Sequence, residues 1–86
     1  MEVIFLPDAE SDLNYWVKTG NKPILKKIAK LIESIEESPF EGIGKPEPLK
    51  YSLNGSWSRR ITKEHRLVYE LDGVKVLIHS AKGHYE

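Results

Sequence analysis

The hydrophobic and polar residues of the chain follow two different periods, one before residue 40 and one after it. A short apolar, β-prone run at residues 2–6 predicts a first strand that is buried on both faces. Pro7 ends this run and suits the first turn of a helix, where its missing N–H is not needed. Apolar residues at helical spacing then predict a helix over residues 7–18 and a more strongly amphipathic one between Asn21 and Ser38. Because about two residues join them, we expect the helices to form an antiparallel hairpin.

Beyond residue 48 the period changes to two, which is typical of strands. Four segments show this alternation, and they cover residues 49–53, 56–62, 66–71 and 74–80. Asn54-Gly55 and Asp72-Gly73 separate them in pairs, and both dipeptides favour tight hairpin turns. The pattern therefore predicts an α+β domain with an N-terminal strand and a two-helix hairpin. These helices pack on one face of a mainly antiparallel sheet that includes a four-strand meander.

The composition is that of a single globular domain. The chain has 86 residues, of which 40% are hydrophobic and 30% charged, so it builds one modest core. Cysteine is absent, which excludes disulfides and thiolate zinc sites and fits a reducing compartment. The apolar runs are too short to span a bilayer and no secretion leader is recognisable, so we expect a cytoplasmic protein.

The net charge of zero hides an asymmetry between the two halves of the chain. Residues 1–43 carry five lysines against eight acidic residues, a net charge of −3. Residues 44–86 carry eight basic residues against five acidic ones, a net charge of +3. A compact basic half can bind a polyanion while the whole chain stays neutral. On charge alone, a solvated surface is the simpler explanation, and the exposed lysines of the second predicted helix usually mean only solubility.

The candidate chemistry lies mostly in residues 44–69. Prolines on both sides hold the carboxylate of Glu47 on a stiffened backbone. Strand alternation places Arg60 and Arg66 together on the sheet face opposite the helices. It places Arg59 on the core side, so that its side chain is expected to reach out past the edge of the core. A solvated pair of surface arginines is the ordinary explanation for Arg60 and Arg66.

Three histidines complete the set of titratable candidates: His65, His79 and His84. Their spacing matches no recognised metal-ligand pattern, so no metal site is predicted. His79 lies within an apolar strand and is interpreted as structural, whereas His84 follows Gly83 near the chain end without a core role. An imidazole, a carboxylate and arginines are the groups of metal-free RNA cleavage. A base takes the 2′-OH proton, cations stabilise the phosphorane and an acid protonates the leaving 5′-oxygen.

One long block of the sequence resembles a known protein family. It reads PFEGIGKPEPLKYSLNGSWSRRITKEHRLVYEL and is followed by a terminal HY. It closely resembles the YoeB/Txe branch of the RelE-type toxins of bacterial type II toxin–antitoxin systems, and the similarity covers essentially the whole chain. The resemblance implies an mRNA interferase, a ribosome-dependent endoribonuclease that cuts mRNA in the ribosomal A site and inhibits translation. It implies no metal or other cofactor.

The resemblance also assigns roles and partners. It implies Glu47 as general base, Arg66 as the residue that stabilises the transition state and His84 as general acid. The substrate-binding residues that it implies are Tyr85, Lys50 and Arg60. The implied partners are a YefM/Phd-type antitoxin, the ribosome with mRNA, a second copy of the chain in a possible homodimer, and DNA only through the antitoxin.

Two residues depart from the family pattern. Lys82 and Gly83 stand where the family usually has an arginine and an aromatic residue, and Gly83 is expected to loosen the segment that aims His84. This departure keeps a second hypothesis open, a co-repressor module that binds RNA, the ribosome or DNA without cleaving. A protein–protein adaptor without RNA contact is a third.

Overall fold

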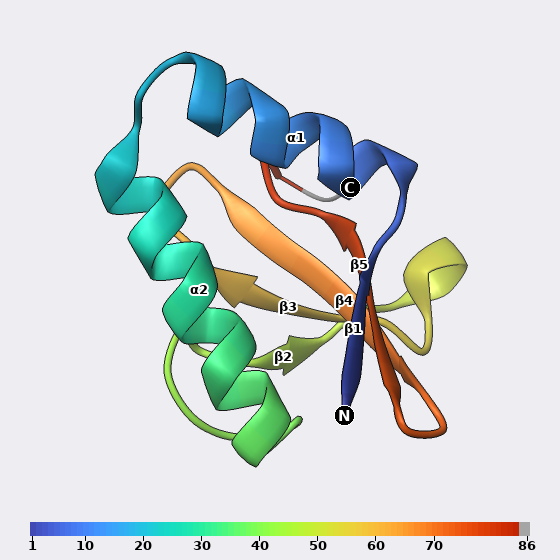
Figure 1. The fold of residues 1–86 in the computed structure, drawn as a ribbon. Coiled ribbons are helices and arrows are strands. Elements are labelled where there is room, and N and C mark those ends of the chain that lie inside the picture. The colour runs from blue at the N-terminus through green and yellow to red at the C-terminus, as the bar shows by residue number, and fades with distance from the viewer. Residues whose placement is uncertain (85–86) are drawn as a thin grey trace.

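A five-stranded sheet carries two helices on one of its faces (Figure 1). The structure, a computed structural model, describes residues 1–84, so Tyr85 lies outside the described residues. The helices are α1 (Pro7–Lys18) and α2 (Lys22–Glu37), and the strands are β1 (Glu2–Phe5), β2 (Glu47–Pro48), β3 (Trp57–Arg60), β4 (Arg66–Asp72) and β5 (Lys75–Ser80). The predicted α+β fold class is confirmed.

Both helices form where the sequence predicts them. Pro7 occupies the first turn of α1, and Asp8 and Glu10 place negative charge at its positive end. The side chain of Asn21 caps α2 by accepting a hydrogen bond from the N–H of Ile24 (3.3 Å). Among residues 1–84, no helix is long and apolar enough to cross a membrane.

The strands follow the order β1-β5-β4-β3-β2, in which only β1 and β5 are parallel neighbours. β4 and β5 form the predicted hairpin around Asp72-Gly73. The expectation that the first strand is buried on both faces is wrong, since β1 is an edge strand and none of its residues is fully buried. The composition of such a short apolar run does not distinguish a central strand, covered on both faces, from an edge strand with one covered face.

The prediction of a strand at residues 49–53 is also wrong. β2 ends at Pro48, and Tyr51 adopts a left-handed φ of 60° and begins a 3₁₀ turn that continues to Leu53. The tight turn at Asn54-Gly55 does form, with a φ of 99° at the glycine. β3 is then shorter than the predicted strand at residues 56–62. The turn dipeptide was therefore a reliable signal, whereas alternation alone overestimated the length of the strands beside it.

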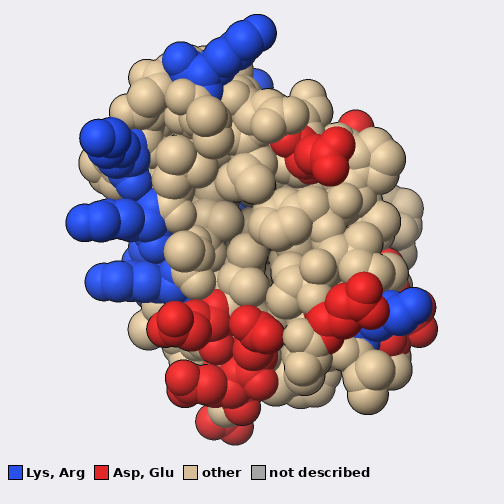
Figure 2. Space-filling model, viewed as in Figure 1, with Lys and Arg blue, Asp and Glu red and all other residues tan. Residues whose placement is uncertain are grey.

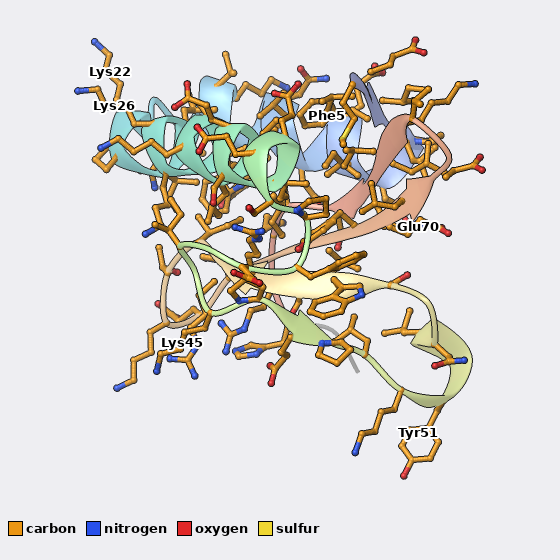
Figure 3. The ribbon with its side chains drawn as sticks, turned by 90° about the horizontal axis from the view of Figure 1, so that it is seen from below. Phe5, Lys22, Lys26, Lys45, Tyr51 and Glu70 are labelled. Carbon is orange, nitrogen blue, oxygen red and sulfur yellow. The ribbon has the colours of Figure 1, made fainter. Side chains whose placement is uncertain are left out.

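The core lies between the helices and one face of the sheet. Its fully buried side chains include Leu31 and Ile35 of α2, Leu67 and Tyr69 of β4, and Val76 and Ile78 of β5. We call the opposite side of the sheet, which the helices leave uncovered, the open face. It faces away from the helices in Figure 3.

The prediction that the Arg59 side chain reaches out past the edge of the core is wrong. Arg59 is fully buried (0% exposed), and its Nε donates to the hydroxyl of Tyr69 (3.1 Å). Its two terminal nitrogens donate to Ser34 Oγ (2.8 Å) and to the carbonyls of Ile43 (3.1 Å), Ser38 (2.7 Å) and Glu41 (2.8 Å). The Tyr69 hydroxyl donates to the Pro39 carbonyl (2.7 Å), and burial raises the pKa of Tyr69 above its ordinary value of 10.0, against the opposing effect of the Arg59 guanidinium. Arg59 thus fixes the loop that leads from α2 to Glu47.

Candidate active site

One row of residues crosses the sheet from β2 to β5. Glu47 lies opposite Ser58, Ser58 opposite Val68, and Val68 opposite Ser80. Directly opposite residues of neighbouring strands place their side chains on the same face. The exposed carboxylate of Glu47 therefore lies on the open face, at the β2 end of this row.

The next row holds the two arginines. Arg60 lies directly opposite Arg66, two residues along β3 and β4 from the Ser58–Val68 pair, so both arginines share the open face as the alternation predicted. Glu47 is the diagonal neighbour of Arg60, a relation that separates Cα atoms by about 7–8 Å. A gap of this size accommodates a phosphodiester between a carboxylate and a guanidinium.

The turn between β3 and β4 positions the guanidinium of Arg66. Its Nη1 donates to the carbonyls of Thr62 (3.2 Å) and Lys63 (3.3 Å). The hydroxyl of Thr62 in turn accepts hydrogen bonds from two backbone N–H groups of the same turn, those of Glu64 and His65 (3.1 Å each). The side chain is therefore held by a turn that is itself ordered by hydrogen bonds.

The chain after β5 returns to this turn and is anchored on the way. Ala81 is fully buried, its carbonyl accepts from Trp16 Nε1 (2.9 Å), and its N–H donates to Asp12 Oδ2 (2.9 Å). Both partners belong to α1. The helix thereby fixes where the last segment of the chain leaves the sheet.

Gly83 is hydrogen-bonded on both sides, which contradicts the expectation that it loosens this segment. Its N–H donates to His65 Nδ1 (2.8 Å), and its carbonyl accepts from the N–H of Arg66 (2.9 Å). Its φ of 76° lies in the region that glycine adopts without strain. These bonds bring the exposed residue His84 to the chain segment beside Arg66.

The structure gives His65, a residue of the segment that carries the candidate chemistry, a part in positioning the tail that the sequence analysis did not predict. Its ring contacts Trp16 edge to face (centroids 4.8 Å apart) while Nδ1 accepts the bond from Gly83. Since Nδ1 is the acceptor, a neutral ring carries its proton on Nε2. The available signal was its place directly before Arg66 in the sequence.

The structure brings some of the predicted residues together and leaves others apart. Glu47, Arg60 and Arg66 share the open face, and the hydrogen-bonded tail carries His84 to the same end of the sheet. Lys50 directly precedes the 3₁₀ turn at Tyr51, and Figure 3 shows Tyr51 at the opposite side of the open face from Lys45. Lys50 is thus placed for a more distant contact than the arginines.

A hollow of about 480 Å³ adjoins the Glu47 row on the open face. Val68 and Ser80 of the row line it, together with Glu70 and His79. His79 is half-exposed rather than buried in the sheet, and its Nε2 lies 2.5 Å from Glu70 Oε1. Within residues 1–84, no three His, Cys, Asp or Glu side chains are grouped so as to hold a metal ion. The polar groups of this face offer proton transfer and cationic stabilisation.

Comparison with known proteins decides the family. Residues 5–85 match the family model described as a YoeB-like toxin of a bacterial type II toxin–antitoxin system. The chain belongs to the YoeB toxin family. It is 49% identical over 85 residues to the toxin YoeB of Escherichia coli (strain K12), covering 99% of this chain and 100% of that protein.

Solved structures of YoeB toxins share the fold. The chain superposes on the toxin in a YoeB–YefM complex from Staphylococcus aureus with a TM-score of 0.89 and 46% identity, covering 99% of this chain and 98% of that one. It superposes on a YoeB dimer from the same species with a TM-score of 0.90 and 45% identity, at the same coverage. The expected RelE-like toxin fold is confirmed.

Proposed function

We propose that this YoeB-family toxin is a ribosome-dependent, metal-independent endoribonuclease that cleaves mRNA in the ribosomal A site and thereby inhibits translation. The observation that carries the proposal is that the strand register puts Glu47 and Arg66 on the open face, while two hydrogen bonds of Gly83 hold the backbone just before His84 against the chain at His65 and Arg66.

The proposed reaction is an in-line transfer within the RNA. Glu47 takes the proton of the 2′-hydroxyl, the 2′-oxygen attacks the adjacent phosphorus, and the bond from phosphorus to the 5′-oxygen breaks. His84 gives a proton to that leaving oxygen, so the products carry a 2′,3′-cyclic phosphate and a 5′-hydroxyl. Arg66 stabilises the charge that develops on the phosphorane oxygens, and its bonds to the turn carbonyls keep the guanidinium oriented before the substrate arrives.

Other residues of the same surface bind the substrate in this proposal. Arg60, opposite Arg66, contacts the phosphate backbone next to the scissile bond. Lys50 binds RNA farther from it, and Tyr85, the next residue after His84, stacks on a base or orients it. The hollow beside Val68 and Ser80 offers room on the same face for a flanking nucleotide.

The proposal includes partners of the toxin in the cytoplasm. A YefM/Phd-type antitoxin neutralises the protein by covering or distorting its basic face, and DNA is contacted only through that antitoxin. Two copies of the toxin form a homodimer. The solved YoeB–YefM complex and YoeB dimer from Staphylococcus aureus support these two interactions, since both toxins share the fold and nearly half of the sequence.

Primer extension on mRNA in translating ribosomes tests the activity. Wild-type protein should produce cuts in A-site codons. Glu47→Ala, Arg66→Ala and His84→Gln should each reduce the cleavage rate by about 10²-fold or more, because acid–base groups and oriented cations each contribute on this scale.

Matched controls separate chemistry from folding. Glu64→Ala removes another carboxylate, one in the β3–β4 turn, and should cleave like wild type. Circular dichroism and thermal melting should show that all variants fold. Wild-type cleavage by Glu47→Ala would require another base. Ribosome binding by the wild-type protein without any cuts would support instead a co-repressor module that binds RNA or DNA without cleaving.

A further inference from the structure

The charges of α2 run against the dipole of the helix. Its exposed lysines at positions 22, 26 and 30, which we call the lysine stripe, run from its first residue to its middle at intervals of four residues. The first turn contains no acidic residue and the last turn no basic one. A helix is stabilised by the opposite distribution, and like charges four residues apart repel each other along its surface.

No ion pair within residues 1–84 compensates for this arrangement. The ion pair found among residues 1–84 joins His79 to Glu70, far from the stripe in the sequence, and no stripe lysine takes part in one. α1 shows the favourable arrangement in the same molecule, with acidic residues in its first turn and Lys18 in its last. Helix stability therefore does not explain the stripe, which leaves a solvated surface or the recognition of an external anion as its role.

The stripe forms a row on one side of the molecule. Figure 2 shows Lys and Arg side chains gathered over the first turns of α2 and acidic side chains over its last turns. Four residues of helix rise by about 6 Å, so the stripe presents point charges at regular steps along a line. A row of flexible ammonium groups is suited to the regularly spaced phosphates of a polynucleotide backbone. Such contacts do not depend on the base sequence.

A series of packing contacts and hydrogen bonds links α2 to the loop beside the candidate active site. Half-buried Lys27 lies one turn before Leu31, and a Cβ atom placed on Gly44 would lie only 2.6 Å from Leu31 Cδ2. The carbonyl of Gly44 accepts a bond from the N–H of Arg60 (2.6 Å). Figure 3 shows Lys22 and Lys26 of the stripe on the same side of the molecule as Lys45, the residue that follows Gly44.

We infer that the lysine stripe binds the phosphate backbone of ribosomal RNA and docks the toxin while the open face engages mRNA. The inference rests on the proposed function, because that function supplies the ribosome as the partner. The stripe is a docking surface separate from the residues that carry out the reaction. Its contribution is to affinity and to salt dependence, not to the chemical step.

The test compares two double variants of equal charge. Lys22→Gln/Lys26→Gln removes two members of the stripe, and Lys18→Gln/Lys75→Gln removes two exposed lysines elsewhere. Binding is measured against purified bacterial ribosomes that carry a 2′-O-methylated mRNA, which cannot react through its 2′-oxygen. The slope of log K against log salt should fall in magnitude by about two in the stripe variant and stay at the wild-type value in the control.

Two further readouts make the result decisive. The melting temperature of the stripe variant should equal or exceed that of wild type, because repulsion within α2 is removed. Equal slopes for both double variants would overturn the inference, as would loss of antitoxin binding in the stripe variant with an unchanged ribosome slope. Failure of the proposed function is distinguishable: wild-type protein would then make no cuts on unmodified mRNA, whereas the slopes would still differ.

Discussion

At the scale of single residues, Arg59 shows how a charged side chain can organise a core. Its guanidinium is surrounded by neutral oxygens, those of two hydroxyl groups and three backbone carbonyls. Alternation along β3 correctly placed this side chain on the core side. It gave no indication of the acceptors, because they come from residues 34–43 and from β4, which only the tertiary fold brings together.

Replacement of Arg59 by lysine tests this organisation. Lysine donates at most three hydrogen bonds from a single nitrogen, so several acceptors lose their partner in a buried place. We expect Arg59→Lys to lower the free energy of unfolding by about 3 kcal/mol, measured by urea denaturation. The matched variant Arg60→Lys alters an exposed arginine and should change it by less than about 0.5 kcal/mol. Similar stabilities for the two variants would contradict the role of Arg59.

The candidate site shows the same division between local and distant information. A period of two was enough to predict that Arg60 and Arg66 share a face, since that depends only on neighbouring strands. The particular contact that anchors the tail, from Gly83 to His65, was not predicted, because it joins residues 18 positions apart in the sequence. The role of His84 came from family resemblance, and its tether came from the structure.

At the scale of elements, the loop between α2 and β2 fixes the approach to Glu47. It was predicted as a loop from its glycines and prolines, and its shape is set by the contacts of Arg59 and Gly44. The failure of the predicted strand at residues 49–53 has a related cause. The chain leaves the sheet at Tyr51, whose backbone adopts a left-handed conformation that a tyrosine does not predict.

Gly44 provides a test of this element. Its φ is 83°, and an added Cβ would lie 2.6 Å from Leu31 Cδ2 and 3.1 Å from Arg59 Cβ. Gly73 has a φ of 61° with no atom within 4 Å of such a Cβ. Gly73→Ala should therefore lower the free energy of unfolding by about 1 kcal/mol, the cost of the left-handed conformation alone. Gly44→Ala should cost about 1–3 kcal/mol more, because packed atoms must move.

Activity separates the two glycine variants further. The displacement at Gly44 is passed along the chain to Glu47, so Gly44→Ala should also cleave mRNA more slowly under conditions in which it is fully folded. Gly73→Ala, at the distant β4–β5 turn, should cleave at the wild-type rate. Thermal melts and primer extension on the same samples give both quantities. Equal effects of the two substitutions on stability and cleavage would contradict the packing argument.

At the scale of the whole molecule, the helices and the core act as a scaffold for a basic surface. The charge asymmetry between the halves of the sequence understates this surface, because the lysine stripe belongs to the acidic half yet lies on the same side of the molecule as Lys45 of the basic half (Figure 3). Sequence reasoning treated the stripe as a solubility feature. Its unfavourable direction along α2 becomes informative once the structure shows that no ion pair among residues 1–84 neutralises it.

The central claim is that the 2′-oxygen of the message attacks the scissile phosphate at the open face. The most direct measurement uses ribosomes programmed with two mRNAs that differ by a single 2′-deoxy substitution at the nucleotide 5′ to the cut. The account predicts that wild-type protein cleaves the all-ribose message to a 2′,3′-cyclic phosphate and leaves the substituted one intact at that position. Cleavage of the substituted message at the same bond would contradict it.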